Sequence, residues 1–391
     1  MRKCLLAVQG PLQFIAGLIA LEWYGHVKHD SSDSEVVLLI YDLSVPTEVE
    51  KSLEEAILNL AAVRRWKSIV FVSAAEMSRM MRRRYPDSID ELRSAIGEPT
   101  FEEIAIMRDY SGAGSPLILN AYPDAVKITY GDSFGLVGNE SELRFRWSWS
   151  LKSGRSLLKA IVRKVLLGSP KRFSFDAAVL TLPIDWSGSY LSEIQLLVPP
   201  RGFALAILKE CGACLSELNS YCQNLLDGAH DPYVILLSTL SDSQLMSSED
   251  EIDLYVSLIR QTVPRGSTVF LKPHPRGEIN VLTSVMKRIG SEYSFQVIDD
   301  SRFSRLPIEL WRLLIEECRI VAVYSTCCLN LNYFYGKEVI LPLNESNIRQ
   351  YVYPKRIASV VKGNAMNLES LNRLKEWDGK SPVWRAAADG L

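Results

Sequence analysis

Short apolar runs alternate with amphipathic segments along the first third of the chain. Apolar runs bounded by polar or glycine positions are typical of buried strands, and apolar positions at helical spacing are typical of helices. We predict strands over residues 5–8, 36–41, 68–72 and 125–130, and helices over residues 11–24, 46–64 and 74–84. Pro46 suits the first turn of its helix, where the missing N–H costs nothing.

The alternation resumes after residue 229. We predict strands over residues 233–237, 269–272, 294–298, 320–324 and 337–343, and helices over residues 248–262, 278–289, 307–317, 325–335 and 368–377. Ser248 is the predicted N-cap of the first of these helices, with Glu251 three residues on as in a capping box. Pro307 is expected in the first turn of the helix that it begins.

Two such halves in series predict an α/β fold with two Rossmann-like domains, whose parallel sheets face each other across a cleft. We expect an N-terminal domain over residues 1–185 and a linker region over residues 186–228, where prolines such as Pro199 and Pro200 occur. The C-terminal domain is expected over residues 229–365. Residues 366–391 are expected to form a terminal helix that packs back on the N-terminal domain.

Composition excludes several classes of protein. The formal net charge of −2 gives no basic field for nucleic acid. No stretch reaches the roughly 18 uncharged apolar residues that a membrane span needs. The seven cysteines form no zinc-type pattern and are expected to be reduced, buried thiols in a cytoplasmic protein. No metal or other cofactor is predicted.

The motif Lys272-Pro273-His274-Pro275-Arg276 directly follows a predicted strand. The two prolines hold the histidine backbone extended, and ligands in open α/β sheets bind at the carboxyl ends of strands. A rigid histidine with basic neighbours is therefore placed to meet an anionic ligand. The alternative is a proline-rich turn that carries a surface histidine.

Hydroxyl pairs follow two more strands of the same half, Ser238-Thr239 and Ser325-Thr326. The second pair begins a predicted helix, where hydroxyls and free N–H groups can bind an anion. Simple N-capping is the alternative for this pair. Together with His274, these residues indicate a phosphate-binding half.

In the first half, the strand that ends near Tyr130 runs into Gly131-Asp132-Ser133. Glycine allows close approach of a ligand, and a carboxylate at the domain cleft would suit a general base. An aspartate in a tight turn is the alternative.

These motifs, in this order, resemble those of bacterial sialyltransferases of the GT-B fold, in particular the alpha-2,8-polysialyltransferase family and its uncharacterised relatives. The resemblance is concentrated in residues 122–135, 237–276 and 306–331. It implies a GT-B-like pair of domains and an inverting transfer of sialic acid from CMP-sialate without a metal.

The resemblance also implies roles for individual residues. Asp132 would deprotonate the acceptor hydroxyl, and His274 would contact the donor phosphate as CMP departs. Glu309, within a Pro-x-Glu segment, would reach the cytidine ribose. The whole donor-binding set is expected to be Lys272, Pro273, Ser238, Thr239, Glu309, Ser325 and Thr326, and the acceptor side Gln9, Gln13 and Gly131.

The first motif departs from the family pattern of two acids followed by glycine. Gly131 stands in place of the first acid and Ser133 in place of the glycine. The role of Asp132 as base depends on this register.

A basic amphipathic segment over residues 151–167 is the candidate for contact with an anionic membrane or an acidic glycan. Its basic residues are Lys152, Arg155, Lys159, Arg163 and Lys164. The alternative is a core-facing helix with a solvated basic face.

The sequence thus predicts a glycosyltransferase that moves sialic acid or a related nonulosonic acid from a CMP-sugar donor to a glycan or glycolipid acceptor, as a cytoplasmic protein peripheral to the inner membrane face. Two alternatives remain open: a GT-B transferase that uses CMP-Kdo or a UDP-sugar, and a non-catalytic relative that binds nucleotide or glycan.

Overall fold

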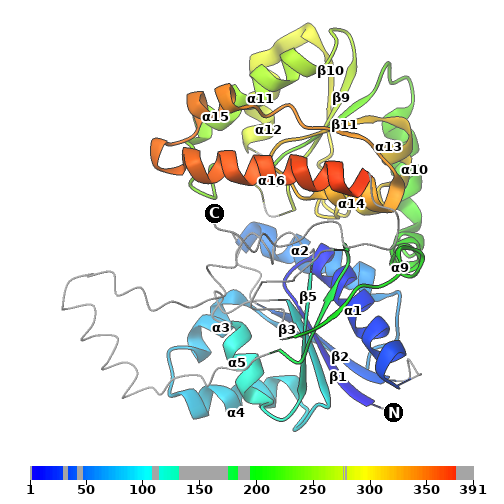
Figure 1. Ribbon diagram of the computed structural model, residues 1–391, viewed down its shortest axis with the longest axis vertical. Helices are drawn as coiled ribbons and strands as arrows, with labels where there is room; N and C mark the ends of the chain where they lie inside the picture. Colours follow the sequence, from blue (N-terminus) through cyan, green and yellow to red (C-terminus); the bar gives the residue numbers. More distant parts are fainter. Residues whose placement is uncertain are drawn as a thin grey trace, which may run out of the picture. The chain divides into compact units, whose positions relative to one another are not determined.

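The computed structural model describes residues 2–29, 34–41, 47–107, 114–131, 175–183, 194–275, 277 and 280–375. These residues form two compact units (Figure 1). Unit 1 contains the described residues of ranges 1–44 and 64–207, and unit 2 those of ranges 45–63 and 208–384. Each unit has its own parallel sheet, which confirms the predicted fold class, α/β with two parallel sheets.

Unit 1 is built on a parallel sheet with the strand order β3-β2-β1-β4-β5-β6-β7 among the described residues. The strands are β1 (Arg2–Val8), β2 (Ser34–Tyr41), β3 (Ser68–Val72), β4 (Glu103–Met107), β5 (Val126–Gly131), β6 (Ala177–Leu180) and β7 (Gln195–Leu197). The helices are α1 (Pro11–His29), α3 (Ala74–Met80), α4 (Tyr85–Ile96) and α5 (Gly114–Ala121). The order reverses between β1 and β4, where α/β sheets open a ligand crevice.

Unit 2 repeats this topology with the order β10-β9-β8-β11-β12. Its strands are β8 (Tyr233–Leu236), β9 (Thr268–Lys272), β10 (Ser294–Val297), β11 (Arg319–Ala322) and β12 (Val339–Ile340). Its helices are α2 (Thr47–Ala61), α10 (Ser216–Leu226), α11 (Ser248–Thr262), α12 (Asn280–Ile289), α13 (Arg312–Glu317), α14 (Cys327–Tyr335), α15 (Glu345–Tyr351) and α16 (Ile357–Lys375), with short 3-10 turns η2 (Gly290–Glu292), η3 (Ile308–Leu310) and η4 (Pro354–Arg356). Helix α9 (Arg201–Ala213) runs across the boundary between the units.

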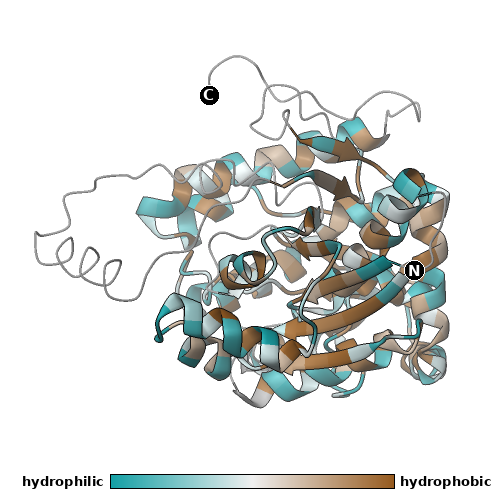
Figure 2. Ribbon diagram, turned by 90° about the horizontal axis from the view of Figure 1, so that it is seen from below, coloured by the Kyte–Doolittle hydropathy of each residue, from teal (hydrophilic) through white to brown (hydrophobic). Residues whose placement is uncertain are grey.

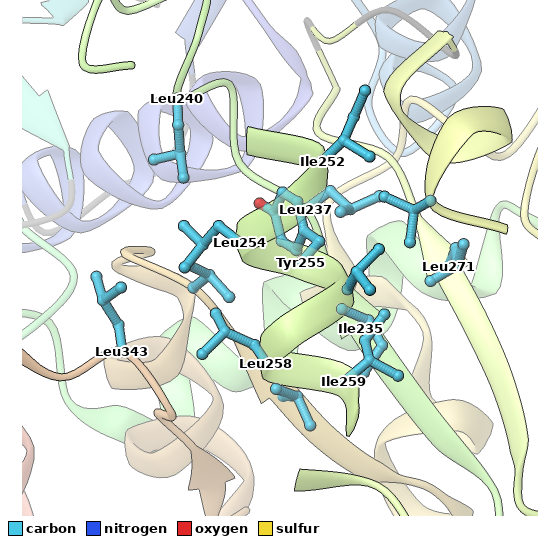
Figure 3. Close-up of a cluster of buried hydrophobic side chains, with 14 of the residues drawn as sticks. Ile235, Leu237, Leu240, Ile252, Leu254, Tyr255, Leu258, Ile259, Leu271 and Leu343 are labelled. Carbon is cyan, nitrogen blue, oxygen red and sulfur yellow. The ribbon is translucent and has the colours of Figure 1, made fainter. Parts of the chain in front are cut away.

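Apolar strands form the centre of both units. Figure 2 shows the strands largely brown, while the helices carry hydrophilic residues on part of their surface. In unit 2 every residue of β8 and β9 is buried. Strands covered on both faces are expected to read as continuous apolar runs rather than alternating ones, as β8 does. Helix α11 supplies Leu254, Tyr255 and Leu258 to this core (Figure 3).

Several predicted elements differ from the structure. Helix α4 and strand β4 were not predicted, and the helix predicted over residues 74–84 ends at Met80. The helix predicted over residues 307–317 is divided into η3 and α13, because Trp311 leaves the helical conformation with φ −90° and ψ 57°. The predicted linker range contains β7, α9 and α10.

The prediction that Ser248 is the N-cap of this helix is wrong. Ser247 is the N-cap of α11, and its hydroxyl accepts the N–H of Asp250 at 3.1 Å. The register shift leaves Glu251 outside the cap. Its carboxylate has a different role, at the site described next.

Candidate functional site

The carboxyl ends of three neighbouring strands in unit 2 bring the predicted motifs together. Strand β8 pairs with β9 on one side and with β11 on the other. His274 therefore follows one neighbour of β8 and Ser325 follows the other, with Ser238 between them. The strand order reverses between β8 and β11, where ligands of doubly wound sheets bind.

A cavity of about 280 Å³ lies at the ends of β8 and β9. Ser238, Thr239, Pro273 and His274 line it, and they are four of the residues predicted from the sequence. Its other lining residues come from the loops after β8 and β9 and from α11 and α12, namely Leu237, Ser241, Asp242, Ser248, Glu251, Ile252, Gly277, Val281, Leu282 and Ser284. Among the described residues, His274 is the one basic side chain in this lining.

Two side chains of α11 hold the loop after β8 in place through hydrogen bonds to its backbone. The carboxylate of Glu251 is buried and accepts the N–H groups of Leu240 at 3.1 Å and Ser241 at 2.9 Å. The hydroxyl of Tyr255 accepts the N–H of Ser238 at 2.7 Å, and burial raises the pKa of this tyrosine. These three hydrogen bonds to backbone N–H groups give the loop a defined conformation.

Ser238 cannot donate a hydrogen bond to a ligand in this conformation. Its N–H is bonded to Tyr255, and its hydroxyl donates to the carbonyl of Val323 at 2.5 Å. The hydroxyl can still accept a bond from a ligand hydroxyl. Thr239 also lines the cavity, and no hydrogen bond of its side chain to another described residue is seen.

The loop after β9 packs closely against the loop after β8. A Cβ placed on Gly277 would lie 3.3 Å from Thr239 Cγ2 and 3.4 Å from His274 Cβ. The N–H of Gly277 donates to the carbonyl of His274 at 2.9 Å. His274 is half-buried at the cavity wall. The predicted rigid presentation of His274 therefore has a structural basis.

Ser325 and Thr326 lie at the end of β11 and do not line the cavity. Tyr324 precedes them with φ +53°, a strained conformation for an aromatic residue. Thr326 is the N-cap of α14, but its side chain makes no capping bond. Ser325 Oγ accepts the N–H of Cys327 at a long 3.4 Å. The Ser325 hydroxyl also donates to Cys327 Sγ at 3.1 Å. Strong N-capping, the alternative for this pair, is therefore not seen at either residue.

Lys272 and Glu309 are both buried. Lys272 is 3% exposed; its ammonium donates to the carbonyl of Ser304 at 3.0 Å and lies 5.1 Å from the centre of the Trp311 ring. Glu309 is 2% exposed and accepts a bond from Asn330 Nδ2 at 2.8 Å. Both were expected to contact the donor. In this structure neither lines the cavity, because both take part in a buried polar cluster below the strand ends.

Burial lowers the pKa of Lys272 to about 7, although the carboxylate of Glu309 opposes this shift. A lysine that binds its proton less tightly when folded penalises the folded state fully below pH 7, and the penalty disappears as the pH rises toward 10.5. The free energy of unfolding of wild type relative to Lys272→Met should therefore rise between pH 7 and 10. The slope should approach but not exceed about 1.4 kcal/mol per pH unit, the limit for one proton.

Chemical denaturation at several pH values measures this difference. Lys287→Met is the matched control, since Lys287 is an exposed residue of α12. A difference that stays constant or falls with pH for Lys272→Met would contradict the assigned burial of the ammonium.

The residues predicted in unit 1 are only partly described. Gln9 and Gln13 follow β1, and the N–H of Gln9 donates to Gln13 Oε1 at 2.8 Å, so Gln13 caps the start of α1. Gly131 ends β5 with φ +155°, which other residues rarely adopt. An acid at this position would be strained, which explains glycine there. Asp132 and the basic segment with Lys152, Arg155, Lys159, Arg163 and Lys164 lie outside the described residues.

All seven cysteines are free, but they are not all buried as predicted, since Cys214 is exposed and Cys327 is partly exposed. No group of three or more His, Cys, Asp or Glu side chains suited to a metal occurs in the described part of the chain. The described helices include none long and apolar enough to cross a membrane. Sequence reasoning missed Glu251, Tyr255 and Arg305. Arg305 is 7% exposed and donates to the carbonyls of Pro275 and Gly277.

One family of known proteins matches the part of the sequence that contains the cavity. Residues 205–343 match the model of the family described as alpha-2,8-polysialyltransferase (POLYST). This range contains Ser238, His274, Glu309 and Ser325, but not Asp132. No curated protein matches the chain significantly.

Solved structures with a similar fold have low sequence identity. The UDP-GlcNAc 2-epimerase of Neisseria meningitidis, bound to UDP-GlcNAc, has 10% identity and a TM-score of 0.47 over 99% of this chain and 95% of its own. The GT-B domain of a Photobacterium damselae sialyltransferase has 10% identity and a TM-score of 0.42 over 92% and 96%. The Escherichia coli heptosyltransferase WaaC with ADP has 12% identity and a TM-score of 0.36 over 89% and 90%.

These structural similarities are too distant to transfer a ligand or an activity. The family match is the finding that bears on function, since it covers the strand ends of unit 2. The predicted resemblance to alpha-2,8-polysialyltransferases is therefore confirmed over residues 205–343, and it supports classification of the chain as a glycosyltransferase.

Proposed function

We propose that this protein is an inverting glycosyltransferase that transfers sialic acid or a related nonulosonic acid from a CMP-sugar to a glycan acceptor. The observation that carries the proposal is the convergence of Ser238, His274 and Ser325 at the carboxyl ends of three adjacent strands, within the range that matches alpha-2,8-polysialyltransferases. Such strand ends are where α/β folds bind nucleotides.

The proposed chemistry is a single displacement. The acceptor hydroxyl oxygen attacks the anomeric carbon of the donor sugar, and the bond from that carbon to the phosphate oxygen breaks. CMP leaves with the bonding electrons, and Asp132 takes the proton from the attacking hydroxyl. His274, with the hydroxyls of Ser325 and Thr326, would stabilise the charge that develops on the phosphate.

A metal ion is not part of this proposal for a chemical reason. A CMP-sugar has one phosphate group, whereas a nucleoside diphosphate sugar has two that a divalent cation commonly bridges. The hydroxyls, the histidine and the N–H groups at the start of α14 supply the polar groups that one phosphate needs.

CMP binding tests the proposal. At a concentration about a hundredfold above Kd, CMP should stabilise the protein by roughly 2.7 kcal/mol. The measurement is thermal unfolding with CMP, UDP, GMP and no nucleotide. Protection by CMP above the other nucleotides is the expected result; no protection by CMP, or protection by UDP alone, would contradict the proposal.

A further inference from the structure

Two basic side chains connect the loop between β9 and α12, which carries His274, to the segment before η3. One belongs to the loop side and the other to the segment before η3. Lys272, at the end of β9, donates to the carbonyl of Ser304 at 3.0 Å. Arg305 Nη1 donates back to the carbonyls of Pro275 at 3.1 Å and Gly277 at 2.8 Å. The loop between β9 and α12 is thus connected at both ends to residues that lie about 30 positions later in the chain.

The environment of Arg305 is unusual for an arginine. Its side chain is 7% exposed, and burial lowers its pKa. No ion pair to a carboxylate is recorded for it within the described ranges, where the neighbouring Arg302 has Asp300 and Glu217. A buried charge needs hydrogen bonds in compensation, and here backbone carbonyls provide them.

The loop needs external donors because of its own sequence. Pro273 and Pro275 have no N–H group, so neither can hold the loop by donating to a neighbouring segment. The bond from the N–H of Gly277 to the carbonyl of His274 closes the turn but does not fix it to the sheet. Arg305 holds this turn to the segment before η3 by donating hydrogen bonds to the carbonyls of Pro275 and Gly277.

We infer that Arg305 is a positioning residue that acts through His274. It keeps the backbone of the loop in the conformation that presents His274 to the cavity, and it does not contact the donor itself. This inference rests on the proposed function, in which His274 contacts the phosphate. A misplacement of about 1 Å is enough to reduce transition-state stabilisation about a hundredfold, so the fixed loop matters for rate.

A double-mutant cycle tests the inference in the full-length protein. Arg305→Met should lower kcat about tenfold or more in the wild-type background, with KM for the CMP-sugar little changed. In the His274→Ala background the same change should cost less than about twofold, because the group that it positions is already absent. Equal losses in both backgrounds, or no loss in either, would overturn the inference.

Arg302→Met is the matched control. Arg302 lies on the same segment, but it is exposed and pairs with Asp300 and Glu217, so its loss should leave kcat within about twofold of wild type. Arg305→Lys keeps the charge but loses the geometry that reaches two carbonyls, and it should lie between wild type and Arg305→Met. If both Arg305 variants fail to fold, Arg305 serves the stability of unit 2 as a whole and the inference is wrong.

A second measurement separates this inference from the proposed function. The imidazole resonances of His274, followed by NMR without any ligand, should shift or broaden in Arg305→Met and stay unchanged in Arg302→Met. Unchanged His274 resonances in Arg305→Met would overturn the positioning role, whatever the activity. If His274 is perturbed but CMP does not bind the wild-type protein, the proposed function fails and the positioning role stands.

Discussion

Replacing His274 with alanine is expected to lower the rate of transfer at least ~10²-fold while unit 2 stays folded. The change removes a basic side chain, the one that the described part of the chain contributes to the cavity lining, and with it the proposed stabilisation of charge on the departing phosphate. The measurement is kcat and kcat/KM for transfer from a CMP-sugar, together with circular dichroism and thermal unfolding.

His230→Ala is the matched control for this variant. His230 is exposed three residues before β8, and its carbonyl accepts the N–H of Thr268, an interaction that alanine retains. The control should keep normal turnover. Near-normal turnover in His274→Ala would refute the assignment of His274, and loss of the folded state would assign His274 a structural role.

Asp132→Asn is expected to abolish transfer and to leave CMP affinity unchanged. A general base acts on the acceptor hydroxyl, so its loss should lower the rate rather than weaken the donor complex. Asn keeps the size and the turn propensity of Asp, so a purely structural role would leave activity largely intact. Turnover and CMP affinity are measured on the same preparation.

Asp124→Asn is the control for this change, because Asp124 is exposed in the turn before β5. It should behave like wild type. Activity retained in Asp132→Asn would mean that another group deprotonates the acceptor. That outcome would remove Asp132 from the mechanism, while CMP binding in unit 2 would still be expected.

Much of unit 2 could be predicted from the sequence because its central strands β8 and β9 are short and fully buried. The continuous apolar run over residues 233–237 is followed by Ser238, so it marks the strand and places its carboxyl end within one residue of Leu236, where β8 ends. The motif after β9 has two prolines that set the local backbone conformation. For this reason the strand-end positions of Ser238, His274 and Ser325 followed from local pattern and the rules of parallel sheets.

The missed parts depend on contacts between distant positions. Strand β4 starts at the buried residue Glu103, whose Oε2 lies 2.6 Å from Arg2 Nη1. The local sequence around Glu103 does not reveal an ion pair with a residue about 100 positions earlier. Lys272 was predicted to bind the ligand because it begins the basic motif that follows a predicted strand. Its position depends on Ser304 and Trp311, about 30 residues away or more. No sequence motif pointed to Arg305, because its hydrogen-bond partners are backbone carbonyls, which every residue has.

A one-residue shift explains the error at α11. Ser247 and Ser248 are both acceptable N-caps, and each has an acid three residues later, Asp250 or Glu251. The structure selects Ser247, because this register leaves Glu251 to bind the N–H groups of Leu240 and Ser241. Tertiary contacts therefore decided between two equivalent local patterns.

A crystal structure of the protein with CMP bound tests the central claim most directly. The account predicts that the nucleotide lies on unit 2 at the carboxyl ends of β8, β9 and β11. Its phosphate oxygens should be within hydrogen-bond distance of His274 and of the hydroxyls of Ser325 and Thr326. A nucleotide bound elsewhere, or a phosphate that touches neither His274 nor Ser325, would contradict the account.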